Sequence, residues 1–191
     1  PECIRRLVIS TVAKYGIDLT RTSNAWNNFA LLGKEAIELK KLGMDTVMNL
    51  IYAISPRHTD EYYALKARDA AALKPYRLCF KDVGGMLTPK QNIGATPLEF
   101  HAHCNNGLAP FNLLEAVKEG VRIVHTAIPP LANGSSQPSI FNVVSNLRAL
   151  GYQPMVNTAV LPPVREHFSR IAAAENLPTG APREYDQAWY G

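Results

Sequence analysis

Two histidines separated by a single residue, His101 and His103, are the residues of this sequence best suited to binding a metal ion. They close a strand-like run, Leu98 to Phe100, and alternate side chains of a strand share one face, so both imidazoles should lie close together. Neutral imidazole nitrogens are common ligands of divalent ions such as zinc. Because H-x-H alone is a weak motif, the alternative is a pair of interior histidines satisfied by hydrogen bonds.

A second polar strand end lies upstream of the histidine pair. The apolar run from Tyr76 to Phe80 closes with Lys81 and Asp82, and the glycines Gly84 and Gly85 follow where the chain must turn sharply. A charged group next to a buried strand needs a partner or a function, because burying an unpaired charge is costly. We expect Asp82 to support the site or the local structure rather than to bind the ion itself.

Three segments of the chain resemble the carboxyltransferase domains of pyruvate carboxylase, oxaloacetate decarboxylase and transcarboxylase. Residues 81–89 (KDVGGMLTP) are similar to the K-D-x-[AG]-G-x-L-x-P segment of that family, and residues 101–103 match its H-x-H. Residues 134–139 (GSSQPS) resemble its G-x-[ST]-S-Q-P-[SA] loop. The three matches, in the same order, are far more specific than any one of them. The resemblance implies an α/β fold, the (β/α)8 TIM barrel, of which residues 1–191 would form the central part.

The resemblance also implies a set of site residues. Lys81, carbamylated and therefore anionic, would bind a divalent ion together with His101 and His103, and Lys81 would be the catalytic residue. Arg21, Ser136 and Gln137 are expected near the substrate, with a purely structural role in their loops as the alternative. His58, His125 and His167 fall in no ligand pattern and are expected at the surface or in the core.

The implied activity is biotin-dependent carboxyl transfer to a 2-oxo acid of the pyruvate or oxaloacetate type, or its decarboxylation, through a metal-stabilised enolate. The implied cofactors are a divalent metal (zinc, manganese or cobalt) and carboxybiotin delivered by a separate carrier domain or subunit. A homo-oligomer is expected. The resemblance places the start of a C-terminal extension at about residue 152, and the chain is expected to begin and end inside its domain.

Two departures from the family pattern keep other functions open. Residues 20–27 retain Arg21 but lack the usual acidic residue, and Cys104 followed by two asparagines replaces the usual D-T after H-x-H. We expect Cys104 to be a packing residue rather than a nucleophile. One alternative is a biotin-independent metal-dependent aldolase or acyl lyase of the HMG-CoA lyase-like superfamily. The other is a catalytically silent barrel subunit.

The elements that position these residues alternate between helix and strand. Apolar periodicity with Gly or Pro stops predicts helices at 2–14, after Asn27, after an N-cap at Thr59, around Phe111, Leu114 and Val117, and from 140 to 150. Five strands are predicted at 17–21, 45–54, 76–83, 97–103 and 121–127. Alternation of this kind favours a parallel sheet, and the absence of a G-x-G-x-x-G loop favours the barrel over the open doubly wound sheet.

One interval breaks the alternation. Residues 83–96 contain three glycines and a proline and have too few helix formers for a crossover helix between parallel strands. We therefore expect residues to be absent between about Gln91 and Asn92, with a true deletion as the alternative.

Composition excludes some functions. The net charge is +4, but lysines and arginines are scattered, so no nucleic-acid surface is expected. Three cysteines lie far apart, which argues against a disulfide framework and favours a cytoplasmic protein. The apolar runs are shorter than the ~20 residues of a membrane-spanning helix, so no such segment is expected.

Overall fold

The computed structural model describes residues 2–86 and 98–190. The chain divides into two compact units, residues 1–81 with 93–98 and residues 82–92 with 99–191. The interval predicted to lack residues, around Gln91 and Asn92, lies outside the described residues. No helix in the described part of the chain is long and apolar enough to cross a membrane.

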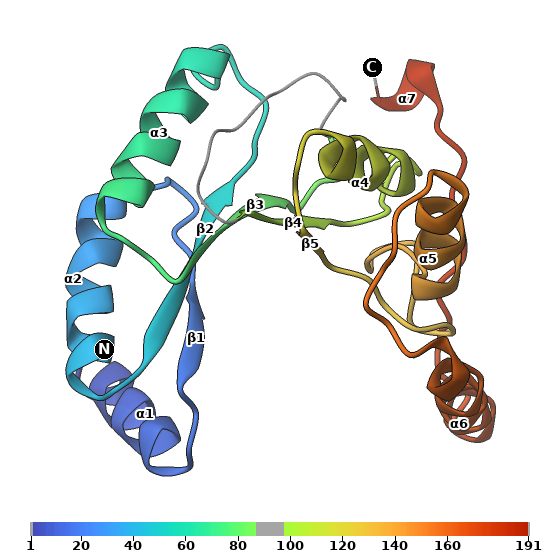
Figure 1. Ribbon diagram of the computed structural model, residues 1–191, viewed down its shortest axis with the longest axis horizontal. Coiled ribbons are helices and arrows are strands. Elements are labelled where there is room, and N and C mark those ends of the chain that lie inside the picture. The colour runs from blue at the N-terminus through green and yellow to red at the C-terminus, as the bar shows by residue number, and fades with distance from the viewer. Residues whose placement is uncertain (1, 87–97, 191) are drawn as a thin grey trace. The chain divides into compact units, whose positions relative to one another are not determined.

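The first unit alternates helices and strands as predicted (Figure 1). Its elements are α1 (Glu2–Lys14), β1 (Leu19–Thr22), α2 (Phe29–Lys41), β2 (Asp45–Ile51), α3 (Asp60–Ala72) and β3 (Arg77–Asp82), whose last residue belongs to the second unit. Strand β2 pairs in parallel with β1 and with β3, and Ile51 lies opposite Lys81. Helices α2 and α3 pack against β2 and against each other. The strands of this unit therefore end at one common edge.

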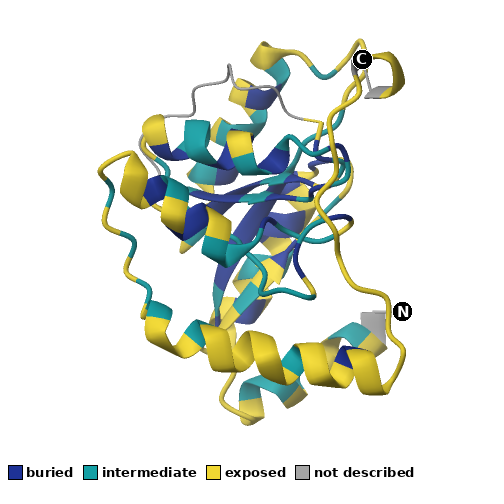
Figure 2. Ribbon diagram, turned by 90° about the vertical axis from the view of Figure 1, so that its right-hand side faces the viewer, coloured by how far each residue is buried: buried dark blue, intermediate teal, exposed yellow. Residues whose placement is uncertain are grey.

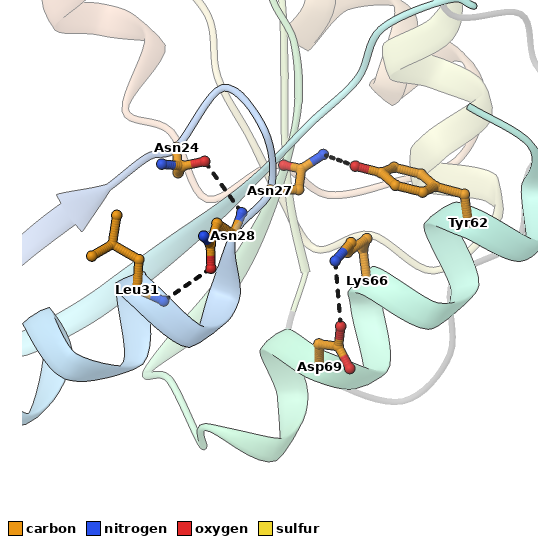
Figure 3. Close-up of polar contacts among 7 residues, drawn as sticks. All are labelled: Asn24, Asn27, Asn28, Leu31, Tyr62, Lys66 and Asp69. Carbon is orange, nitrogen blue, oxygen red and sulfur yellow. Dashed lines mark hydrogen bonds and ion pairs between the residues drawn. The ribbon is translucent and has the colours of Figure 1, made fainter. Parts of the chain in front are cut away.

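The carboxyl end of β2 is held by a buried asparagine. Asn27 is 1% exposed, and its side-chain amide accepts a hydrogen bond from the Ile51 N–H at 2.8 Å and donates one to the Ile51 carbonyl at 2.9 Å. The same amide lies 3.5 Å from the Tyr62 hydroxyl of α3 (Figure 3). Next along the chain, the Tyr52 N–H donates to the Lys81 carbonyl at 2.9 Å. This network fixes the backbone on which Lys81 is carried.

The second unit contains β4 (Leu98–Ala102, in this unit from Glu99), α4 (Ala109–Lys118), β5 (Ile123–Val124), α5 (Ile140–Ala149), the 3-10 helix η1 (Thr158–Val160), α6 (Leu161–Ala174) and α7 (Gln187–Tyr190). Strands β4 and β5 are parallel, with Glu99 opposite Ile123 and Phe100 opposite Val124. Helices α4 and α5 pack together. Most residues of β2, β3 and β4 are buried, whereas both residues of β5 are of intermediate exposure (Figure 2).

The structure corrects one predicted helix face. Helix α4 buries Ala109, Asn112, Leu113 and Val117, whereas Phe111 is 65% exposed. The predicted face consisted of Phe111, Leu114 and Val117, which are spaced by three residues. The face that the structure buries is a neighbouring one and shares only Val117 with it. Apolarity favoured the set with Phe111, but packing selects the set that includes the polar Asn112.

Candidate metal centre

Strand β4 presents its polar residues on one face. Glu99 and His101 alternate with the buried Phe100 and Ala102, and His103 continues the same alternation just beyond the strand. The His103 N–H donates to the Asp82 carbonyl at 3.1 Å, which extends the parallel ladder by one residue. The two histidines of the H-x-H pair thus point the same way, as predicted.

The two imidazoles meet through their Nε2 atoms. His101 Nε2 lies 3.1 Å from His103 Nε2, and the side-chain amide nitrogen of Gln137 lies 3.4 Å from each of them. The loop that carries Gln137 is tied to the strand end, because the Cys104 N–H donates to the Ser136 carbonyl at 2.9 Å. Three of the residues predicted from the sequence therefore converge on one point: His101, His103 and Gln137.

The hydrogen bond at the far side of His103 determines which of its nitrogens is protonated. Its Nδ1 lies 2.6 Å from the Ser135 carbonyl oxygen. Because a carbonyl can only accept, Nδ1 must be the donor, and a neutral His103 then has a lone pair at Nε2. That lone pair points toward His101 Nε2.

His101 is contacted on its other side by a residue that sequence patterns did not single out. Its Nδ1 lies 2.9 Å from Nδ1 of His125, which directly follows β5, and His125 Nε2 lies 3.4 Å from a carboxylate oxygen of Glu99. The backbone N–H of His125 donates to the Phe100 carbonyl at 3.0 Å, so strand pairing places it there. The sequence signal that could have found it is the position of a histidine at the end of the next strand.

These contacts fit a divalent cation. Two imidazole nitrogens that face each other at 3.1 Å repel if both carry lone pairs, and a cation between them removes that repulsion. Imidazole donors suit zinc, and also cobalt and other transition ions. Among the described residues, however, no group of three or more His, Cys, Asp or Glu side chains is arranged to hold a metal ion. A further ligand must therefore be of another chemical type, such as a carbamylated lysine, or come from elsewhere.

The other predicted site residues lie as follows. Lys81 is half-buried near the end of β3, and Arg21 is exposed on β1; both belong to the first unit. Asp82 is fully buried, and its Oδ1 accepts from the Met86 N–H at 3.0 Å. Ser136 contributes its backbone carbonyl to the loop contact with Cys104. Asp82 therefore closes the turn after β3, and its contribution to a metal site stays a prediction.

Cys104 is buried and unreactive in character. It is 2% exposed and free, and burial raises the pKa of its thiol to about 11. Since the thiolate is the nucleophilic form, the thiol is protonated and inert at neutral pH. This agrees with the predicted packing role.

The turn after Asp82 packs tightly beneath the site. Gly85 has φ +69°, and a Cβ at this position would collide with the His103 carbonyl oxygen, whereas a Cβ at Gly84 would meet only the flexible side chain of Met86. We expect Gly85→Ala to lower the free energy of unfolding by about 2–3 kcal/mol and to weaken metal binding by displacing His103. Urea denaturation and metal content would measure both effects, with Gly84→Ala as the matched control. Equal behaviour of the two variants would contradict this account of the turn.

A separate groove in the first unit is not part of this site. It has a volume of about 650 Å³ and lies between the start of α2 and the end of α3, where Asn28 caps α2 and Lys66 pairs with Asp69 at 3.6 Å (Figure 3). None of the site residues predicted from the sequence lines it.

The comparisons with known proteins agree with the resemblance carried by the three motifs. No family model matches the chain. It is 31% identical over 181 residues to a pyruvate carboxylase subunit of Methanothermobacter thermautotrophicus, a match that covers 90% of this chain and 32% of the relative. It is 27% identical to the methylmalonyl-CoA carboxyltransferase 5S subunit of Propionibacterium freudenreichii, over 89% of this chain and 36% of the relative.

Solved structures give the fold. The carboxyl transferase domain of Rhizobium etli pyruvate carboxylase, determined with pyruvate and biocytin, matches the whole of this chain with a TM-score of 0.87 and 20% identity, over 35% of that domain. The chain thus has the α/β fold of part of the (β/α)8 barrel of the carboxyl transferase domains, as predicted. The chain is homologous to the pyruvate carboxylase subunit and to the transcarboxylase 5S subunit, and it spans about a third of their length.

Proposed function

We propose that this chain carries the metal-binding part of a biotin-dependent carboxyltransferase that acts on a 2-oxo acid of the pyruvate or oxaloacetate type. The observation that carries the proposal is the convergence of His101 Nε2 and His103 Nε2 at 3.1 Å, beside the Gln137 amide. Relatives named as a pyruvate carboxylase subunit and a transcarboxylase subunit favour this reaction over an aldolase, an acyl lyase or a silent barrel.

The residues have distinct roles in the proposal. His101 and His103 bind the cation through Nε2, and Lys81 supplies an anionic oxygen after carbamylation. Zinc, manganese and cobalt are the candidate ions. When bound, such an ion polarises the ketone oxygen of the 2-oxo acid and stabilises the charge of its enolate by several kcal/mol. Gln137 and Ser136 line the substrate side, and the Arg21 guanidinium binds the substrate carboxylate.

The wider assembly is also part of the proposal. Carboxybiotin reaches the site on a carrier domain or subunit, and the enzyme is a cytoplasmic homo-oligomer. Free thiols at Cys79 and Cys104 are consistent with a reducing compartment. The C-terminal extension begins at about residue 152, just before η1 and α6.

The test combines metal analysis with an assay for biotin dependence. We expect purified full-length protein to contain about one divalent ion per chain. We also expect it to decarboxylate oxaloacetate or carboxylate pyruvate only with its biotinylated carrier, and avidin should block the reaction. A biotin-independent cleavage activity would support the lyase alternative, and protein that binds no metal would support the silent barrel.

A further inference from the structure

A buried carboxylate lies behind the metal-binding histidines. Glu99 is 1% exposed and sits on the same face of β4 as His101. Removing a carboxylate from water costs several kcal/mol unless it is paired, so a glutamate at this depth needs a reason. Its Oε2 lies 3.4 Å from Nε2 of His125, whose side chain is 23% exposed, and this contact has the distance of an ion pair without the geometry of a hydrogen bond.

The contacts form a single line from Glu99 to the metal-binding point. The carboxylate contacts His125 Nε2, His125 Nδ1 contacts His101 Nδ1 at 2.9 Å, and His101 Nε2 faces His103. His125 meets the nitrogen of His101 that points away from His103. It is therefore placed to orient His101 and not to bind the same ion.

Donor and acceptor roles along this line follow from its ends. The negative charge of the Glu99 carboxylate, 3.4 Å from Nε2 of His125, favours a neutral His125 with its proton on Nε2 and a lone pair on Nδ1. That lone pair accepts from His101 Nδ1–H, which leaves the lone pair of His101 on Nε2. This is the state that a metal ligand requires. His103 is held in the equivalent state by a different partner, the Ser135 carbonyl.

We propose that Glu99 and His125 are positioning residues for the metal centre, which fix the ring orientation and the protonated nitrogen of His101. This inference rests on the proposed function, because it assigns a purpose to the pair only if His101 binds a metal ion. It gives one common role to the buried Glu99 and to the two imidazoles that approach each other through Nδ1.

The experiment is a Co²⁺ titration of the metal-free full-length protein, followed by visible absorption and by competition with a chelator. We expect Glu99→Gln, which keeps size but removes the charge, to weaken Co²⁺ binding by about 10-fold, and His125→Phe by about 10- to 100-fold. The ligand-field bands should also change, because His101 is no longer held in one orientation. The double variant should be no weaker than His125→Phe, since the two residues act in series.

Two further variants separate positioning from folding. Glu115→Gln removes an exposed glutamate of α4 that pairs with Lys118 at 2.6 Å, and it should bind Co²⁺ like the wild type. His125→Asn keeps an amide near the Nδ1 position and should recover part of the affinity lost in His125→Phe. Far-UV circular dichroism verifies that each variant is folded.

The outcomes distinguish this inference from the proposed function. If the wild type binds Co²⁺ through His101 but Glu99→Gln, His125→Phe and His125→Asn match its affinity and spectrum, the positioning role is wrong and the metal centre stands. If the wild type binds no Co²⁺, or His101→Ala binds it equally well, the metal centre itself is wrong.

Discussion

Replacing His103 with alanine is expected to remove the bound divalent ion and to abolish carboxyl transfer. The variant loses one of the two Nε2 atoms that meet at 3.1 Å, and a single imidazole leaves the site too weak to retain the ion. A cation that polarises the ketone contributes several kcal/mol to the reaction, so the rate should fall by about 10³-fold or more. Metal content and the biotin-dependent rate would be measured on the same preparations.

The loss should not come from unfolding. The substitution also removes the hydrogen bond from His103 Nδ1 to the Ser135 carbonyl, which contributes about 1 kcal/mol of stability, a small part of the total. His167→Ala is the matched control, because His167 is exposed on α6 and should leave both readouts unchanged. A His103→Ala protein that keeps its metal and its rate would rule out this ligand.

Features governed by local interactions could be predicted from the sequence. The range of α1, Glu2–Lys14, agrees with the apolar periodicity, and Thr59 caps α3 by accepting from the Tyr62 N–H at 3.3 Å. Gly16 and Gly43, expected to end helices, both have positive φ. Each of these depends on a few neighbouring residues, which the sequence contains in full. Strand ends were predicted less exactly. The strand predicted at 45–54 ends at Ile51, whose N–H and carbonyl are both hydrogen-bonded to the side chain of Asn27.

Features that depend on strand pairing were missed. His125 was expected at the surface or in the core, and only the β4–β5 register brings it against His101. Glu99 could have been suspected, because it lies two residues before His101 and strand alternation puts both on one face. A glutamate at such a position is usually solvated, so the sequence alone gives no reason to connect it with a neighbouring strand. The structure shows where His101, His103 and Gln137 converge, but the roles of all the predicted site residues remain predictions from the resemblance.

Replacing Lys81 with arginine is expected to eliminate metal binding and carboxyl transfer as completely as the loss of a histidine ligand. The ε-amine of lysine can add CO₂ and become an anionic carbamate, whereas a guanidinium cannot and keeps its positive charge. An arginine in place of the ligand would repel the ion, because two unit positive charges about 4 Å apart cost about 4 kcal/mol at an effective dielectric constant of 20, and a divalent ion doubles this cost. The expected loss in metal affinity is therefore at least about 10³-fold.

The carbamate can be observed directly. After incubation with ¹³C-labelled bicarbonate, the wild type should show a carbamate carbon by NMR and Lys81→Arg should not. Lys66→Arg is the matched control, since Lys66 is also half-buried and pairs with Asp69 on α3, where arginine can replace it. If Lys81→Arg retains the metal and the activity, the ion must take its remaining ligands from other groups. The shortage of carboxylate and cysteine ligands around His101 and His103 makes that outcome hard to reconcile with a metal centre built from the described residues alone.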